Sequence, residues 1–127
     1  MLHPMLRYGL VAGALACAAG SAAAHHGWAD YDPRRPVNLV GTVREVRYAN
    51  PHVTLQLQTP AAGRTPAATW RVVLAPVARM QRRGVTEARL RPGTTVRVIG
   101  ERHRRIAREV KIEWIVIDGD TAQIRRG

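Results

Sequence analysis

Alternating hydrophobic and polar positions are clearest in the stretch Gly41–Gln58, which predicts a β-hairpin. Within it, Val53, Leu55 and Leu57 alternate with threonine and glutamine. A period of two is the pattern of a strand that buries one face. We therefore expect a strand over residues 52–59, with these three side chains inward.

The first strand of this hairpin is expected over Val37–Tyr48, but its hydrophobic positions do not alternate strictly. One extra residue near Arg44–Glu45 would return them to a single face, so the pattern predicts a β-bulge there. The two strands are joined at Asn50 and Pro51. Proline fixes φ and disfavours the helical region for the residue before it, so this pair favours a turn.

The rest of the chain predicts three further strands, one short helix, a helical turn and a short return strand. In chain order these are a strand at Thr69–Ala75, a helix at Val77–Arg83, a helical turn at Thr86–Leu90, strands at Thr95–Gly100 and Glu109–Asp118, and a return strand at Thr121–Ile124. A short helix between the third and fourth of five strands is typical of the OB-fold. We expect a mainly β protein, a small five-stranded OB-like barrel; an open β-roll and a sandwich fragment are the alternatives.

Strand periodicity also predicts which side chains form the hydrophobic core. The expected members are Val43, Val46, Val53, Leu55, Leu57, Trp70, Val72, Leu74, Val96, Val98, Ile112 and Trp114. On the fifth strand the expected inward face carries Val110, Ile112, Trp114 and Val116, and the opposite face carries Ile115 and Ile117.

The first 24 residues have the pattern of a secretory signal peptide. Arg7 precedes an apolar run over residues 8–19, and small residues allow cleavage after Ala23 or Ala24. This run is too short to span a bilayer, although a retained membrane anchor and lipidation at Cys17 are alternatives. The mature protein is therefore expected in the periplasm or secreted, without a membrane span and as a monomer.

Two further segments follow the predicted signal peptide. Residues 25–36 lack periodicity and are expected to form an N-terminal arm, whose Trp28 and Tyr31 pack onto the barrel. Asp30 and Asp32 in this arm are expected to pair with neighbouring arginines or to cap turns. Residues 37–127 are expected to form the OB-like domain.

Composition limits the chemistry that is open to the mature protein. The only cysteine and the only serine of the whole chain, Cys17 and Ser21, lie in the predicted signal. Disulfides, cysteine zinc sites and serine or cysteine nucleophiles are therefore not expected in the mature protein. No pair of carboxylates is placed for acid–base catalysis. We therefore expect a non-enzymatic binding or accessory module of the bacterial envelope.

The formal net charge is +11 at pH 7, and Lys111 is the sole lysine among 20 basic residues. Such a surface attracts anions, which include nucleic acids, anionic lipid head groups and acidic proteins. For an exported protein, an envelope polyanion or an envelope protein is the expected partner. Nucleic acid is not, because the aromatic residues at apparent core positions leave few side chains to stack on bases.

Several short motifs, taken in order, resemble a family of small secreted bacterial proteins that carries no assigned function. They are Ala24-His25-His26, Gly41-Thr42-Val43, Ala49-Asn50-Pro51-His52, Trp70, Leu90-Arg91-Pro92-Gly93 and Asp118-Gly119. Members usually carry serine after the histidine pair, where this chain has Gly27. The resemblance implies no known activity and no catalytic residue.

Four histidines outside the signal are candidate ligands for Cu(II): His25, His26, His52 and His103. A new amino terminus at His25, or at Ala24, would combine the terminal amine with imidazole and backbone nitrogens, which suits the tetragonal preference of Cu(II). In an OB-like barrel, Asn50, His52 and His103 are expected near one another. Alternatively, the His52 ring bonds to the backbone of the turn.

Basic residues crowd the segment between the fourth and fifth strands. Arg102, Arg104, Arg105 and Arg108 lie in the expected loop 101–108 and form a candidate anion-binding site. A solvated basic loop without a ligand is the alternative. Binding of a polyanion or nucleic acid by this loop is the alternative function to copper binding.

Overall fold

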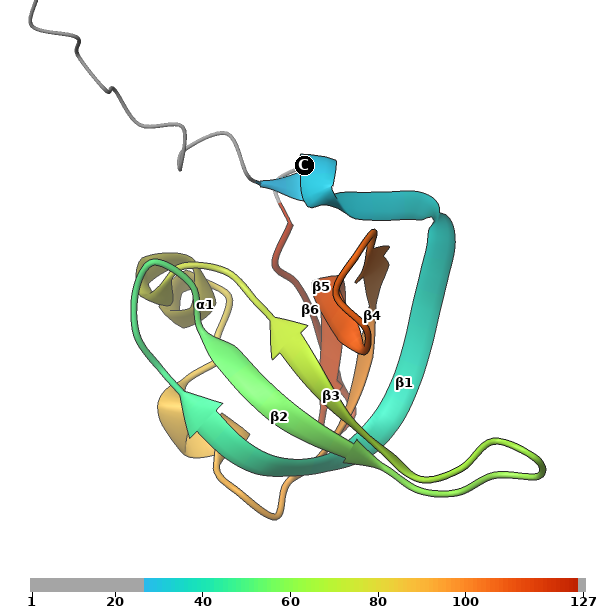
Figure 1. Ribbon diagram of the computed structural model, residues 1–127. Coiled ribbons are helices and arrows are strands. Elements are labelled where there is room, and N and C mark those ends of the chain that lie inside the picture. Colours follow the sequence, from blue (N-terminus) through green and yellow to red (C-terminus); the bar gives the residue numbers. More distant parts are fainter. Residues whose placement is uncertain (1–26, 126–127) are drawn as a thin grey trace, which may run out of the picture.

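The computed structural model describes residues 27–125, which fold into a mainly β structure (Figure 1). The strands are β1 (Tyr31–Arg47), β2 (Thr54–Thr59), β3 (Ala68–Val73), β4 (Thr95–His103), β5 (Glu109–Ile117) and β6 (Asp120–Gln123). The helical elements are η2 (Trp28–Asp30), α1 (Val77–Arg82) and η3 (Glu87–Leu90). Both the strand-rich class and the short helix between β3 and β4 are confirmed. Within residues 27–125, no helix is long and apolar enough to cross a membrane.

The strands form one sheet with the order β3-β2-β1-β4-β5-β6, in which all neighbours pair antiparallel. In addition, β3 pairs parallel with β5, through Arg71–Val73 and Glu109–Lys111. β1 is long and strongly curved, so that its first part runs beside β4 and its last part beside β2 (Figure 1). The return strand after the fifth strand is also confirmed, as β6.

The β1–β2 hairpin has the predicted bulge. Val43 pairs with Leu57, but the register then shifts before Glu45, so Arg44 is the extra residue. Gly41 lies where the backbone of β2 leaves no room for a side chain, because a Cβ atom there would lie 2.5 Å from the backbone oxygen of Gln58. At the hairpin turn, the Asn50 side-chain oxygen accepts a hydrogen bond of 3.0 Å from the backbone N–H of Val77, which joins the turn to the start of α1.

β1 begins at Tyr31, earlier than the expected Val37, and β4 continues to His103 rather than ending at Gly100. Tyr31 pairs with His103. The pairing is irregular between Asp32 and Pro36, and this irregularity accommodates two prolines that would interrupt a regular ladder. Residues expected in a separate arm are thus part of the sheet.

A second irregularity corrects the predicted inward face of β5. Ile99 pairs with Trp114 and Gly100 pairs with Ile112, which leaves Glu113 without a partner in register. The bulge reverses the alternation, so that Ile115 is buried whereas Trp114 is only partly buried. The prediction that Trp114 and Val116 belong to the core is therefore wrong, and Ile115 and Ile117 take their place.

The remaining predicted core residues are buried in one cluster, except Val46, which is partly buried and packs against it. The helical segment between β3 and β4 adds Met80, Val85 and Leu90 to this cluster. The core thus occupies the space enclosed by the curved strands and the segment that contains α1.

Candidate anion-binding site

Five arginines line one pocket of about 320 Å³ at the junction of β4 and β5, which we call the arginine pocket. They are Arg35, Arg102, Arg104, Arg105 and Arg108. Its other lining residues are His103, Ile106, Ala107 and Glu109. The four arginines predicted from the sequence are thus brought together, and Arg35 joins them.

Two segments that are far apart in the sequence position these arginines. Arg102 lies near the end of β4, and the others of the predicted set follow in the turn that leads to β5. Arg35 comes from the irregular part of β1, which runs beside the end of β4. Sequence reasoning missed Arg35 because the flanking prolines Pro33 and Pro36 suggested an arm outside the sheet.

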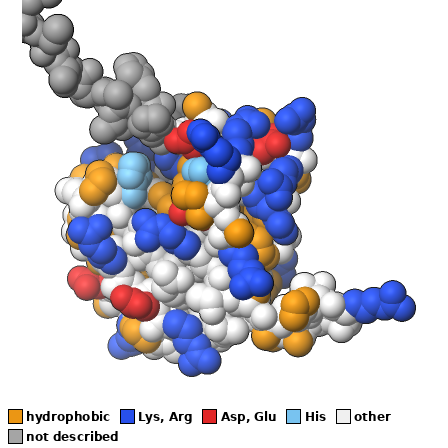
Figure 2. Space-filling view, in the orientation of Figure 1, with side chains coloured by type: hydrophobic (Ala, Val, Ile, Leu, Met, Phe, Trp, Pro, Cys, Tyr) orange, Lys and Arg blue, Asp and Glu red, His pale blue; other side chains and the backbone are white. Residues whose placement is uncertain are grey.

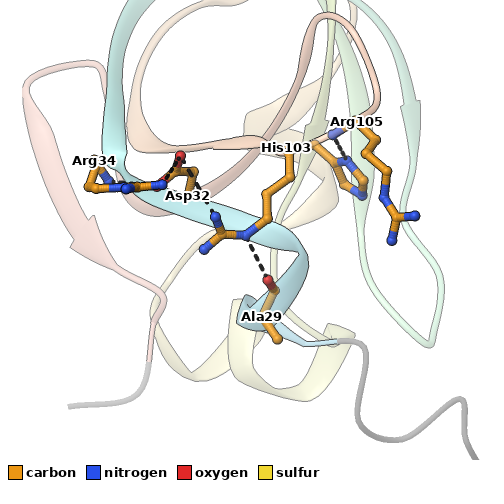
Figure 3. A network of polar contacts seen from close by, with 6 residues as sticks. Ala29, Asp32, Arg34, His103 and Arg105 are labelled. Atoms are coloured by element: carbon orange, nitrogen blue, oxygen red, sulfur yellow. Dashed lines mark hydrogen bonds and ion pairs between the residues drawn. The ribbon is translucent and has the colours of Figure 1, made fainter.

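The buried carboxylate of Asp32 attaches the start of β1 to the turn after β4 (Figure 3). Its Oδ1 accepts hydrogen bonds of 3.1 Å from both the backbone N–H and the Nε of Arg34. Arg104 lies 3.7 Å from Oδ2 and also donates from Nε to the carbonyl of Ala29 at 3.0 Å. Hydrogen bonds from Arg34, together with the charges of both guanidinium groups, hold the pKa of Asp32 below its usual range. The expected pairing of Asp32 with a neighbouring arginine is confirmed.

Glu109 lies at the edge of the arginine pocket and is already occupied by other partners. Its Oε1 accepts a buried hydrogen bond of 2.6 Å from the hydroxyl of Tyr31. Its Oε2 lies 3.3 Å from the Nε of Arg71. Burial, and then the hydrogen bond to Glu109, raise the pKa of Tyr31. Both carboxylate oxygens of Glu109 thus have partners, Tyr31 and Arg71, that do not line the pocket.

His103 shapes the turn that carries the arginines. Its Nδ1 accepts a hydrogen bond of 3.0 Å from the backbone N–H of Arg105 (Figure 3). It accepts a second, of 2.9 Å, from the backbone N–H of Ile106. Its ring packs edge-on against Tyr31 at a centroid distance of 5.1 Å. His103 thus has a structural role in holding the turn.

Four pocket arginines have no ion pair with a carboxylate among residues 27–125: Arg35, Arg102, Arg105 and Arg108. The guanidinium carbon of Arg102 lies 4.9 Å from the centroid of the Trp70 ring, which holds it by a cation–π contact. The pocket therefore presents several guanidinium groups whose hydrogen-bond donors are open to a ligand.

Comparison with protein families gives one match. A family model described as a family of unknown function, DUF6152, covers residues 12–110 of this chain. The chain belongs to the DUF6152 family. No curated protein matches it. The matched region contains every residue that lines the arginine pocket. The resemblance inferred from the sequence motifs is confirmed.

The candidate copper ligands of this DUF6152 protein are distributed differently from the arginines. His52 lines a separate pocket of about 320 Å³, together with Trp28, Arg79, Lys111 and Arg125. Burial, and then the charge of Lys111, lower the pKa of His52. Since His103 lines the arginine pocket instead, the two histidines belong to different pockets.

No group of three or more histidine, cysteine or acidic side chains within the described part of the chain is arranged to hold a metal. His25 and His26 lie outside the described residues. The copper prediction thus stays a prediction.

The His52 pocket also contains the sole lysine. Lys111 is buried, and its ammonium nitrogen lies 5.3 Å from the ring centroid of Trp28. Burial lowers the pKa of Lys111, and the neighbouring charge of Arg125 adds to this effect. Arg125 itself lies over the same Trp28 ring at 4.2 Å. The Trp28 ring thus makes cation–π contacts with both Lys111 and Arg125.

Proposed function

We propose that this DUF6152 protein is an exported, non-enzymatic module that binds anionic ligands in its arginine pocket. The observation that carries the proposal is the group of four pocket arginines that lack a carboxylate partner in the described chain. Neighbouring guanidinium groups repel one another, and an anion between them relieves this repulsion. Each also offers a planar pair of N–H donors that matches a carboxylate or phosphate group.

The charge distribution supports this proposal. The formal net charge of +11 attracts anions over a distance and raises their rate of encounter with the protein. Basic side chains are prominent over the visible face of the molecule (Figure 2). Asp32 pairs with Arg34 and with one pocket arginine, Arg104. Glu109 is engaged by Tyr31 and Arg71, so the other four arginines keep the pocket positive.

We further propose that the fold is an OB-like barrel. Supporting this, the successive pairings β1–β2, β2–β3, β3–β5, β5–β4 and β4–β1 form a closed circuit. In OB-folds, the loops after the first and fourth strands flank the ligand face. The arginine pocket lies at the turn after β4, in agreement with that arrangement.

Among anionic ligands, we favour an envelope anion over a nucleic acid. Single-stranded nucleic acids are bound by stacking their bases on exposed aromatic rings. The two aromatic rings beside pocket residues, Tyr31 against His103 and Trp70 against Arg102, are both buried. An exported protein would also meet envelope polyanions first.

The test compares the triple variant Arg102→Gln, Arg105→Gln and Arg108→Gln with a control that loses three charges elsewhere. The control variant, Arg44→Gln, Arg82→Gln and Arg83→Gln, removes exposed arginines that line neither the arginine pocket nor the His52 pocket. Binding of inorganic phosphate and of heparin is measured by calorimetry at two salt concentrations. We expect the pocket variant to lose about tenfold or more in affinity, roughly the effect of one lost charge-assisted hydrogen bond. Equal losses in the two variants would show that only net charge matters.

Copper binding is a second candidate function, supported by the position of Trp28. Trp28 lines the same pocket as His52, and His26 precedes Trp28 by two positions. Burial, and then the charge of Lys111, lower the pKa of His52 and so favour its neutral form, which is the form that coordinates metals.

The copper proposal is tested by Cu(II) titration of three forms of the processed protein. Adding Gly-Ser before the natural amino terminus should abolish tight binding if the terminal amine is a ligand. His52→Ala should weaken binding by about 10–100-fold, as for a damaged metal site. Equal affinity in all three forms would refute an organised site.

A further inference from the structure

A third pocket, of about 550 Å³, adjoins the arginine pocket and is distinct from the His52 pocket; we call it the apolar groove. Its walls come from β1, from the start of β3 and from the loop between β2 and β3, which projects from the body of the molecule (Figures 1 and 2). Leu39, Val40, Pro60, Pro66 and Trp70 are among its lining residues. The groove is thus a concave site with a largely hydrophobic lining.

The two pockets are contiguous because they share lining residues. Arg102 and Arg108 line both the arginine pocket and the apolar groove. The Arg102 guanidinium, held 4.9 Å from the centroid of Trp70, lies where the hydrophobic lining meets the cluster of positive charge. A ligand that extends from one pocket into the other would pass beside this residue.

Exposed hydrophobic side chains point to the same place. Within residues 27–125, the large hydrophobic side chains that remain exposed are Val40, at 44%, and Ile106, at 50%. Val40 lines the apolar groove, and Ile106 lines the arginine pocket. Exposed apolar surface that gathers beside one concave site is a usual mark of ligand binding.

We propose that the combined site binds a monomeric anionic amphiphile, a molecule with one phosphate or carboxylate head and an aliphatic body. The head would lie among the guanidinium groups and the body along the groove, covering the exposed side chain of Val40. This inference rests on the proposed anion-binding function and specifies the ligand class for it. Charge complementarity accounts for the head, but an inorganic anion would leave the adjoining hydrophobic lining in water.

The concave shape favours a single amphiphile over a membrane surface. The groove lies between β1 and the projecting loop, and its volume is in the range of small-molecule sites. Insertion into a bilayer calls instead for apolar side chains on a convex surface. Binding to a vesicle is therefore the competing outcome in the test.

The test measures binding of three probes to the processed protein by calorimetry: dodecyl phosphate below its micelle concentration, inorganic phosphate, and dodecyl maltoside. Burial of a few methylene groups should make dodecyl phosphate bind at least about tenfold more tightly than phosphate. The neutral maltoside should bind more weakly than dodecyl phosphate, because it lacks the charge that the arginines recognise.

Variants separate the two parts of the site. Val40→Gln should weaken dodecyl phosphate binding by about threefold to tenfold and leave phosphate binding unchanged, because only contact with the aliphatic body is lost. Val116→Gln, the same change on the outer face of β5 and outside both pockets, is the control and should alter neither.

Each failure has a distinct signature. Equal affinity for phosphate and dodecyl phosphate would overturn the amphiphile inference and leave the anion-binding function intact. Absence of binding by both anions would overturn the proposed function as well. Binding to vesicles of anionic phospholipid without binding to monomeric dodecyl phosphate would overturn the inference in favour of a membrane-surface site.

Discussion

Replacing Tyr31 by phenylalanine removes one buried hydroxyl that ties the start of β1 to β5. This hydroxyl donates a hydrogen bond of 2.6 Å to the carboxylate of Glu109, and both residues are buried. Phenylalanine keeps the ring, so the edge-on contacts with Trp28 and His103 remain and no large cavity forms. The substitution thus isolates the contribution of one charge-assisted hydrogen bond.

The expected loss is about 2 kcal/mol, since hydrogen bonds to charged groups contribute roughly 1.5–3 kcal/mol. Glu109 keeps Arg71 as a partner, 3.3 Å from its other oxygen, which prevents a larger loss. In a domain of this size, about 2 kcal/mol lowers the melting temperature by about 8–16 °C. Urea unfolding followed by tryptophan fluorescence measures the free-energy difference directly.

Tyr48→Phe provides a matched control. The Tyr48 hydroxyl donates a hydrogen bond of 2.7 Å to the backbone carbonyl of Val85, a neutral acceptor, in a partly buried position. Its removal should cost about 0.5–1.5 kcal/mol. The reasoning would be refuted if Tyr31→Phe cost less than Tyr48→Phe, because the charge of Glu109 and the deeper burial would then contribute nothing.

Three further predictions follow from the fold. Trp70→Ala should lower the free energy of unfolding by about 3–5 kcal/mol, and Trp114→Ala by clearly less, because only the Trp70 ring is in the core. The reverse order in denaturant unfolding would contradict the β5 bulge. Because burial raises the pKa of both Tyr31 and Tyr48, the stabilisation from their neutral forms is complete below about pH 10 and falls as the pH rises further. Near pH 10 the native processed protein should therefore show little tyrosinate absorbance, which should appear on unfolding. Gly100→Ala should lower the free energy of unfolding by about 1–3 kcal/mol or more in the same assay, because the new Cβ would collide with the backbone of β5. An unchanged stability would show that β4 and β5 lie further apart.

The alternation of hydrophobic and polar residues predicted the bulge in β1 but not the bulge in β5. The bulge in β1 could be inferred because Val43 and Val46 are both hydrophobic and only a bulge returns them to one face. The bulge in β5 could not, because hydrophobic residues occupy both faces of that strand. Regular alternation from Val110 and Ile112 would place Trp114 on the inner face, whereas one extra residue would place Ile115 there instead. The sequence allows both, and only the pairing with Ile99 and Gly100 decides between them.

The candidate site was also predictable only where its residues are close in sequence. The arginines after β4 are close in sequence, and their proximity in space follows from the short turn that holds them. Arg35 was not predictable, because its position depends on a long-range pairing between Asp32 and Arg102 across β1 and β4. The expected proximity of His52 and His103 depends in the same way on tertiary structure, and the two side chains line different pockets.

The burial of Lys111 has a consequence for the chemical reactivity of the protein. Lys111 is the only lysine of the chain, and the rings of Trp28 and Tyr31 lie close to its amine. Reagents that acylate primary amines should therefore react slowly with this side chain in the folded protein. Labelling with amine-reactive esters would thus leave Lys111 in place, while every arginine of the pocket keeps its charge.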